Sequence, residues 1–333
     1  MNSSATAKAE PEKTKMAWEF KHSRPLTSCV WDPKNRYVYF GAEDNLIHRY
    51  DIASKLVTPF AHHDSWVRGL GLSLDGEVFY SGGYDGKLVW WPASAEKPTP
   101  MRTVEAHRGW LRALAISPDG KLMATCGNDL LVKLWDAVDG KLVKEFAGHL
   151  SHVYNVIFSQ DGSTVFSCDL KGVVNGWKIA TGEKQELATV KAFHVYDTTF
   201  RADIGGARSI TLRSDGVQLA LGGIINVTNA FAGVGEVAVA LVNLQQPKLD
   251  QLLESKEKTR GTTWGLAHHP DGFWIGLSGG SGGWLHFWKG DAAHEFFKMK
   301  LKDDGRGMCL SPDKSQIAIA HADLHLRAYS LHG

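Results

Sequence analysis

The chain has 333 residues and an almost balanced charge, with 37 Lys and Arg against 36 Asp and Glu and a formal net charge of +1. This balance offers no overall electrostatic attraction to nucleic acid or to an anionic membrane. Four cysteines, Cys29, Cys126, Cys168 and Cys309, show no C-x-x-C spacing and predict buried free thiols in a reducing compartment. No run of 18 apolar residues occurs and the first residues lack the apolar core of a signal peptide, so we expect a cytoplasmic protein.

The amino-terminal segment divides into two parts. Residues 1–14 are small, polar or charged, and we expect a disordered tail because they can bury little apolar surface. In residues 15–21 the apolar Met16, Trp18 and Phe20 alternate with polar residues, which predicts a half-buried strand. From residue 15 to residue 333 the sequence predicts a single domain.

Residues 106–136 contain the clearest pattern in the chain. An apolar run is followed by a Pro-Asp-Gly turn at 118–120, a second apolar run, a polar turn and a third run that ends with Trp-Asp at 135–136. Asp-Gly between two β-prone runs favours a hairpin, because glycine tolerates the positive φ that such turns need. The pattern predicts three antiparallel strands joined by tight turns.

Four polar side chains of this unit can form one hydrogen-bonded chain across the strands. His107 precedes the first strand and Thr125 lies in the second. Asp129 is in the following turn and Trp135 ends the third strand. Such a chain satisfies polar groups that a packed sheet buries. With these residues the unit resembles a WD repeat, which in its family forms one four-stranded blade of a β-propeller.

The unit recurs along the chain. Histidines at the matching position are 41, 44 and 42 residues apart, within the period of WD repeats. Turns equivalent to 119–120 recur at 215–216, 271–272 and 313–314. The resemblance implies an all-β fold: a seven-bladed β-propeller of four-stranded antiparallel blades, in which the strand at 15–21 completes the last blade and closes the ring. The matching histidines are His22, His63, His107 and His149, and the aromatic residues that end the third strands are Tyr50, Trp91, Trp135 and Trp177.

The completeness of the polar chain differs among the units. In the first unit, Phe40 and Tyr50 replace the hydroxyl and the Trp. In the fourth unit, Lys171 stands where the Asp is expected, and we expect that chain to be broken because a cation cannot accept a hydrogen bond from histidine. The complete sets are His63, Ser81, Asp85 and Trp91 in the second unit and His107, Thr125, Asp129 and Trp135 in the third.

The fifth unit contains two insertions. Trp177 to Asp215 spans 38 residues, against 26 in the preceding unit, and Asp215 to Val242 spans 27 instead of 16. The extra residues fall at about 194–206, before the first strand, and at about 223–235, between the second and third strands. Both places lie on the same face of a propeller, and lengthened loops on a rigid scaffold often carry function.

The register of the seven units predicts which side chains surround the mouth of the central channel. Two positions near the start of the first strand, and the residue before the turn Asp, are common partner-contact positions in the family that the chain resembles. The alternative is that each arginine found there pairs with a neighbouring carboxylate. The predicted partner-binding residues are Trp66, Arg68, Tyr84, Trp110, Arg112, His152, Tyr154, Arg208, Trp264 and Arg306, and the equivalent positions of other blades hold Thr27, Glu43 and Asn128.

This set of residues favours a particular kind of partner. Several like charges converging on one ring attract an anionic ligand, and Arg, Trp and Tyr are enriched at binding hot spots. We therefore expect a non-catalytic interaction platform that binds a protein or peptide partner, expected to be acidic, on the channel-mouth face. We expect a monomeric propeller within a larger complex, with no nucleic-acid or membrane partner.

The alternative function is a propeller enzyme, such as a metal-dependent hydrolase or lactonase, with its site in the channel. Such a site needs inward carboxylates and histidines, whereas the register places Arg and aromatic residues at the mouth. The histidines show no H-E-x-x-H spacing, and the chain contains no G-x-S-x-G motif and no dinucleotide fingerprint. We therefore expect no metal, no cofactor and no catalytic residues.

Overall fold

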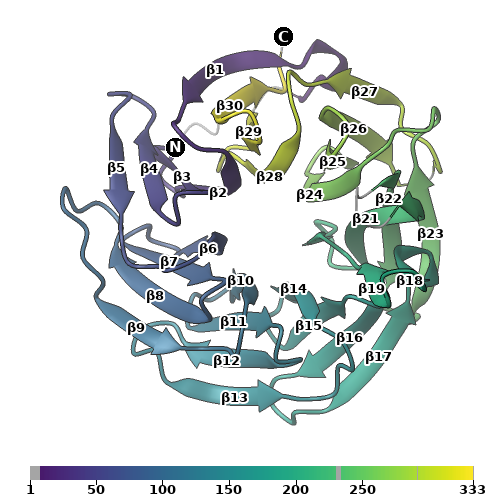
Figure 1. Ribbon diagram of the computed structural model, residues 1–333, viewed down its shortest axis with the longest axis horizontal. Helices are drawn as coiled ribbons and strands as arrows, with labels where there is room; N and C mark the ends of the chain where they lie inside the picture. Colours follow the sequence, from purple (N-terminus) through teal and green to yellow (C-terminus); the bar gives the residue numbers. More distant parts are fainter. Residues whose placement is uncertain (1–7, 230–233, 291, 333) are drawn as a thin grey trace.

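The structure is a ring of seven β-sheets around a central channel (Figure 1). This computed structural model describes residues 8–229, 234–290 and 292–332. Each of the seven sheets has four antiparallel strands, so the predicted seven-bladed propeller is confirmed. Within the described ranges, no helix has the length and apolar character needed to cross a membrane.

Neighbouring strands pair within each blade, from the innermost strand at the channel to the outermost at the rim, and they are consecutive in sequence except for the outermost strand of blade seven (Figure 1). Blade one consists of β2 (Leu26–Trp31), β3 (Tyr37–Ala42), β4 (Ile47–Asp51) and β5 (Val57–Phe60). Blade two consists of β6 (Val67–Leu72), β7 (Val78–Gly83), β8 (Lys87–Pro92) and β9 (Arg102–Glu105). Blade three consists of β10 (Leu111–Ile116), β11 (Leu122–Gly127), β12 (Val132–Asp136) and β13 (Leu142–Phe146).

The remaining blades follow the same order. Blade four consists of β14 (Val153–Phe158), β15 (Thr164–Asp169), β16 (Val173–Lys178) and β17 (Lys184–Thr189). Blade five consists of β20 (Ser209–Leu212), β21 (Gln218–Asn229), β22 (Val234–Asn243) and β23 (Lys248–Glu254). Blade six consists of β24 (Thr262–His269), β25 (Phe273–Gly279), β26 (Trp284–Lys289) and β27 (Phe297–Lys300), and blade seven of β28 (Gly305–Leu310), β29 (Gln316–His321), β30 (His325–Ser330) and β1 (Lys15–Lys21).

The core lies between neighbouring blades, where side chains of adjacent sheets meet face to face. Tyr39 of blade one stacks on Phe79 of blade two with ring centroids 4.4 Å apart, and Phe60 meets the fully buried Trp91 edge-on at 5.4 Å. Such aromatic pairs contribute about 0.5–1.5 kcal/mol beyond the area they bury. Because neighbours cover both faces of a blade, the second strand of most blades is buried almost throughout, and all seven residues of β25 are buried.

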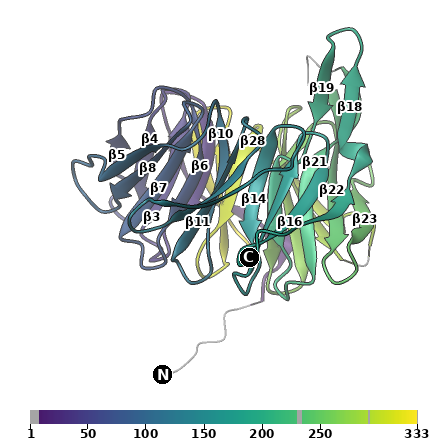
Figure 2. The same cartoon turned by 90° about the horizontal axis from the view of Figure 1, so that it is seen from below.

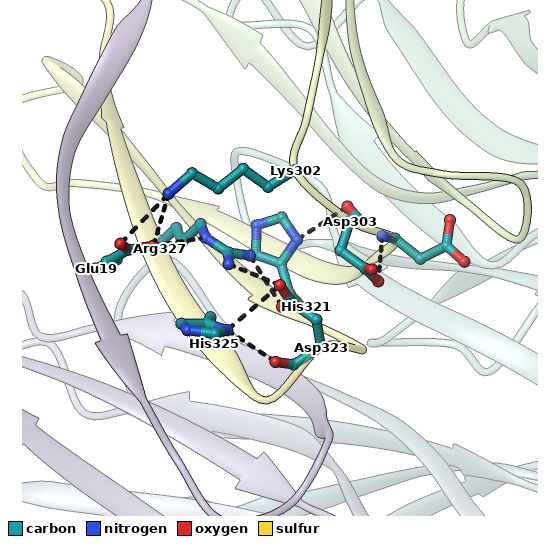
Figure 3. A network of polar contacts seen from close by, with 8 residues as sticks. Glu19, Lys302, Asp303, His321, Asp323, His325 and Arg327 are labelled. Carbon is teal, nitrogen blue, oxygen red and sulfur yellow. Dashed lines mark hydrogen bonds and ion pairs between the residues drawn. The ribbon is translucent and has the colours of Figure 1, made fainter.

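The ring is closed by pairing of the first and last strands. β1 runs antiparallel to β30, from Lys15 opposite Ser330 to Lys21 opposite His325, so the predicted closure is confirmed. An ion-pair network joins the two strands (Figure 3). The Arg327 side chain of β30, 2 % exposed, contacts Glu19 of β1 at 3.1 Å and Asp323 at 2.7 Å.

Residues 8–14, which the sequence assigns to a disordered tail, pack against the last two blades. They include the short 3₁₀-helix η1 (Pro11–Lys13). The amide of Ala9 donates to Asp271 Oδ2 at 2.7 Å, and the amide of Glu10 donates to the carbonyl of Leu331 at 2.7 Å. Backbone amides and two small apolar residues make these contacts, so the polar composition does not reveal them. Residues 1–7 of the predicted tail lie outside the described residues.

Both insertions of blade five rise from one face of the ring. The first forms the 3₁₀-turn η2 (Lys191–Phe193) and a hairpin of β18 (His194–Asp197) and β19 (Ala202–Gly205), which projects beyond the other blades (Figure 2). The second lengthens β21 and β22 on the same face. The two are packed together, because an added Cβ at Gly223 would lie 2.9 Å from the ring of Phe193. Residues 230–233 of the second insertion lie outside the described residues.

The four cysteines are free thiols. Cys126 and Cys168 are buried on the second strands of blades three and four, and burial raises the pKa of both thiols well above its ordinary value. A thiol that resists ionisation is a poor nucleophile, so these two act as small apolar residues. Cys29 and Cys309 lie on the innermost strands of blades one and seven, with their Sγ atoms 3.8 Å apart.

Candidate binding site at the channel mouth

Hydrogen-bonded chains within blades two and three hold the mouth in place. In blade three, His107 Nδ1 lies 2.8 Å from Asp129 Oδ1, and His107 Nε2 lies 2.8 Å from Thr125 Oγ1. The indole of Trp135 donates to the same hydroxyl at 2.8 Å. Each hydrogen-bonded chain connects the segment before the innermost strand to the turn after the second strand. Blade two has the same geometry, with distances of 2.8–3.1 Å among His63, Ser81, Asp85 and Trp91.

Blade four also has a complete chain, which corrects the expectation that Lys171 breaks it. Asp169, the last residue of β15, supplies the carboxylate, with Oδ2 3.0 Å from His149 Nδ1. His149 Nε2 lies 2.8 Å from Ser167 Oγ, to which Trp177 donates at 2.7 Å. The other oxygen of Asp169 accepts the amide of Lys171 at 2.9 Å. An aspartate two residues earlier than expected therefore both completes the chain and holds the turn.

The aspartates of blades two and three are ionised members of these chains. Burial alone would raise the pKa of Asp85 and Asp129, but hydrogen bonds from His63 and His107 outweigh it and lower the pKa of each carboxyl. A carboxyl whose pKa is lowered by folding adds stability above its unfolded pKa, near pH 4, and this contribution is lost as the pH falls further. The supports of the mouth are thus intact at neutral pH.

Arginine and aromatic side chains alternate around the mouth. The guanidinium carbons of Arg112 and Arg208 lie 4.3 and 4.2 Å from the centre of the Tyr154 ring. Arg208 also lies 5.6 Å from the Trp264 ring, and Arg68 lies 5.0 Å from it. Arg68 belongs to blade two and Trp264 to blade six, so Arg68 reaches across the mouth. We call these five residues the cationic-aromatic ring; each cation–π contact contributes about 0.5–1 kcal/mol or more.

Two exposed tryptophans flank the cationic-aromatic ring. The ring of Trp110, 43 % exposed, stacks on Tyr84 at a centroid distance of 4.3 Å and is also 4.5 Å from the Arg112 guanidinium. Arg112 Nε donates to Asn128 Oδ1 at 2.8 Å, which fixes the guanidinium beside both rings. Trp66 is 40 % exposed. These large apolar surfaces face solvent on a preformed frame.

One of the four arginines predicted at the mouth is paired with a carboxylate. Arg306 forms an ion pair with Glu43. Among the described residues, Arg68, Arg112 and Arg208 form no ion pair with a carboxylate. Burial lowers the pKa of Arg68, and the nearby Arg208, Arg306 and Arg112 lower it further, but a guanidinium stays charged at physiological pH. The mouth therefore carries three positive charges that no carboxylate of the described residues pairs with.

A cavity of about 460 Å³ opens at the mouth. Its lining includes the cationic-aromatic ring with Trp66, Tyr84, Trp110 and Arg306, and otherwise consists mostly of small and apolar residues of the innermost strands. The volume falls in the range of about 300–1,000 Å³ that is typical of ligand pockets. The structure thus brings nine of the ten predicted partner-binding residues to one cavity.

The other predicted positions differ in their surroundings. His152 is half-buried outside the lining of this cavity, and burial together with the charge of Arg112 lowers its pKa. Thr27 is buried, and its hydroxyl donates to the carbonyl of Val67 rather than facing the large cavity. Burial alone would raise the pKa of Tyr154, but the flanking Arg208 and Arg112 lower it.

Sequence reasoning missed a second lobe of the mouth. A cavity of about 320 Å³ shares Trp66, Arg68, Trp264 and Arg306 with the first and adds Asp304 and the turn of blade six. The amide of Gly282 donates to Asp304 Oδ1 at 2.6 Å, which fixes this turn beside the lobe. The glycine-rich segment at 279–283 is the available signal, but glycines alone do not say what a turn encloses.

Comparison with known proteins agrees with the fold. Residues 54–92, 98–136 and 140–178 match the family described as WD domain, G-beta repeat. Each match covers the outer strand of one blade and the first three strands of the next, ending in blades two, three and four, the blades with complete hydrogen-bonded chains. A search of curated protein sequences gave no match. The chain therefore contains three matched WD repeats and folds as a ring of seven four-stranded blades, which is consistent with a WD-repeat β-propeller.

Proposed function

We propose that the protein is a non-catalytic interaction platform that binds an acidic peptide or protein segment at the channel mouth. WD40 propellers are commonly protein-interaction scaffolds. The observation that carries the proposal is the set of three arginines, Arg68, Arg112 and Arg208, which surround one cavity with no ion-pairing carboxylate among the described residues. An anionic segment supplies the missing counter-charges.

The side chains of the cationic-aromatic ring are held in place in the unbound protein. Arg112 is held by Asn128, Tyr84, Trp110 and Tyr154, so little side-chain freedom is lost when a carboxylate binds. Binding of a carboxylate also relieves the mutual repulsion among the arginines. Apolar walls around a like-charged cleft also focus its field toward an oppositely charged ligand. These effects favour a ligand with several carboxylates over a neutral one.

The flanking features fit a peptide better than a small anion. Trp66 and Trp110 provide apolar contact area beside the charges, and buried aromatic and arginine anchors dominate the energy of many interfaces. The hairpin of β18 and β19 rises on the same face and offers a wall for selecting among acidic partners (Figure 2).

The 460 Å³ cavity gives no support to the rival function, a propeller enzyme. The residues that line the 460 Å³ cavity include no His, Asp or Glu, the residue types that act as general bases or hold a catalytic metal.

Four free thiols support a location in the cytoplasm. We also propose one propeller per molecule within a larger complex.

A quantitative pull-down from lysate of the source organism tests the proposal. We expect the wild-type protein to retain an acidic protein that the Trp110→Ala/Arg112→Glu double variant loses, because the variant removes an exposed aromatic contact and inverts a ring charge. Circular dichroism and thermal unfolding show whether the variant is folded. Mass spectrometry identifies the protein that differs.

A matched control separates the mouth from general charge effects. Lys121→Glu makes the same charge change in blade three, at an exposed side chain of the β10–β11 turn on the opposite face. The control should retain the partner at the wild-type level. Equal recovery by the wild type and the folded double variant contradicts the proposal.

A further inference from the structure

Blade one contains a cluster of two histidines and one aspartate that differs from the chains of blades two to four. His22 Nε2 lies 3.2 Å from Asp44 Oδ2, and His48 Nε2 lies 3.0 Å from the same oxygen. The three ligating atoms lie within 4.8 Å of one another. His22 follows β1, Asp44 is in the turn between β3 and β4, and His48 is within β4.

The orientation of His22 is the first sign of a separate role. In blades two to four the matching histidine turns Nδ1 toward the aspartate and Nε2 toward a hydroxyl. Blade one has Phe40 in place of that hydroxyl, and His22 turns Nε2 toward Asp44 instead. His48 is an additional histidine that the complete chains of blades two to four lack. Two imidazole nitrogens therefore converge on one carboxylate oxygen.

The surroundings hold the three side chains in place. The ring of His48 stacks on Phe40 with centroids 5.1 Å apart, and the rings of His22 and His48 are 4.2 Å apart. The second oxygen of Asp44 accepts the amide of Leu46 at 3.0 Å, so Oδ2 is left to face the two nitrogens. A ligand carboxylate that is itself hydrogen-bonded is typical of metal sites.

We propose that His22, Asp44 and His48 form a binding site for a divalent transition-metal ion of the Zn²⁺ type. With bonds of about 2.1 Å, the ligand atoms of a tetrahedral zinc site lie about 3.4 Å apart. The observed nitrogen–oxygen separations of 3.0 and 3.2 Å are close to this value, so a metal can replace the two hydrogen-bonding protons with small side-chain shifts. Imidazole ligands favour Zn²⁺, Ni²⁺, Co²⁺ or Cu²⁺ over Mg²⁺ or Ca²⁺.

Access and position define what the ion does there. The side chains of His22 and Asp44 are 11 % and 23 % exposed, so an ion can enter and a water molecule can take the fourth position. His22 directly follows the strand that closes blade seven, whereas the other two ligands belong to blade one. The ion links these blades where the ring closes, and it stabilises the folded protein in proportion to its concentration over the dissociation constant.

Isothermal titration of EDTA-treated, dialysed protein with ZnCl₂ tests the site. We expect one ion per chain, a rise in melting temperature with added Zn²⁺, and no response to MgCl₂. CoCl₂ should give the visible absorption bands of tetrahedral Co²⁺. His48→Gln and Asp44→Asn should each weaken binding by about 100-fold or more, because even loss of a second-shell partner costs 10–100-fold.

The controls make every outcome decisive. His62→Gln replaces an exposed histidine of the next blade junction and should leave Zn²⁺ binding unchanged. Asp44→Asn keeps an oxygen that accepts hydrogen bonds from the histidines, so we expect this variant to fold. Its melting temperature without metal checks this. Absence of saturable Zn²⁺ binding in the wild-type protein overturns the proposal. Wild-type affinity in both ligand variants overturns it equally, because it assigns the ion to other side chains.

Discussion

His286 lies in the interior of blade six without a hydrogen-bond partner for either ring nitrogen among the described residues. Its side chain is 1 % exposed and stacks on Trp288 with ring centroids 5.1 Å apart. Burial, aided by the charge of Lys298, lowers the pKa of His286 to about 3. The ring is therefore neutral at physiological pH, and its two unpaired nitrogens cost roughly 1–3 kcal/mol.

His286→Leu is expected to raise the free energy of unfolding by about 1 kcal/mol at pH 7, because leucine has a similar volume and no polar atom to bury. The unfolded chain binds a proton at this histidine near pH 6.5, and the folded protein only near pH 3. Stability therefore falls as the pH drops through this window, and the variant should lose this part of the pH dependence. Urea denaturation at pH 7 and pH 5 measures both effects.

The matched control is the same substitution at a histidine that has hydrogen-bond partners, His107→Leu. It removes the contacts to Asp129 and Thr125, so we expect a loss of about 2 kcal/mol or more. A comparable loss in His286→Leu, or an unchanged pH dependence, contradicts the interpretation of His286 as an unsatisfied group.

At the scale of elements, the closing strand β1 depends most on contacts that are distant in the sequence. Its partner β30 is the last strand of the chain, and Arg327 joins the two from a buried position. The guanidinium contacts Glu19 on one side and Asp323 on the other (Figure 3). Removal of this cation leaves two carboxylates without their shared buried partner.

Arg327→Met is expected to lower the free energy of unfolding by about 3 kcal/mol, the low end for breaking a buried ion pair, because Glu19 and Asp323 are partly exposed. Lys302→Met is the control, since Lys302 contacts the same Glu19 from an exposed position and should contribute less than about 1 kcal/mol. Guanidinium denaturation measures both variants. Equal effects of the two substitutions contradict the role assigned to Arg327.

The repeated elements could be predicted because their signals are local. One unit is marked within about 30 residues by His107 at its start, Asp119-Gly120 in its first turn and Trp135 at the end of its third strand, and the same spacing recurs. The exceptions depend on tertiary contacts. Residues 8–14 contact the last two blades through bonds such as that of Ala9 to Asp271, 262 residues away. Asp169 completes the blade-four chain because its carboxylate reaches His149 from the strand end, which spacing alone does not show.

At the scale of the whole molecule, the ring geometry creates the candidate site. The register of the blades predicted which side chains surround the mouth, because each occupies an equivalent position near the start of an inner strand. It could not predict that Arg68 crosses from blade two to Trp264 of blade six, since that contact depends on the width of the channel. Nor could it show that, within the part of the chain that the structure describes, Arg306 is the one of the four arginines that pairs with a carboxylate.

The central claim is that the mouth binds carboxylates, and fluorescence titration with a defined peptide tests it most directly. The probe is a glutamate-rich peptide of about ten residues, and the control probe has glutamine at every glutamate position. Tryptophan fluorescence reports binding, because three tryptophans line the mouth. The titration is run at low and high salt, with the wild-type protein, Arg112→Gln and the opposite-face variant Lys121→Gln.

The account predicts that the glutamate peptide binds the wild-type protein with an affinity that falls as salt rises. The glutamine peptide should bind at least tenfold more weakly, Arg112→Gln should lose about tenfold in affinity for the glutamate peptide, and Lys121→Gln should lose none. Equal affinity for the two peptides, or an unchanged affinity in folded Arg112→Gln, would contradict it.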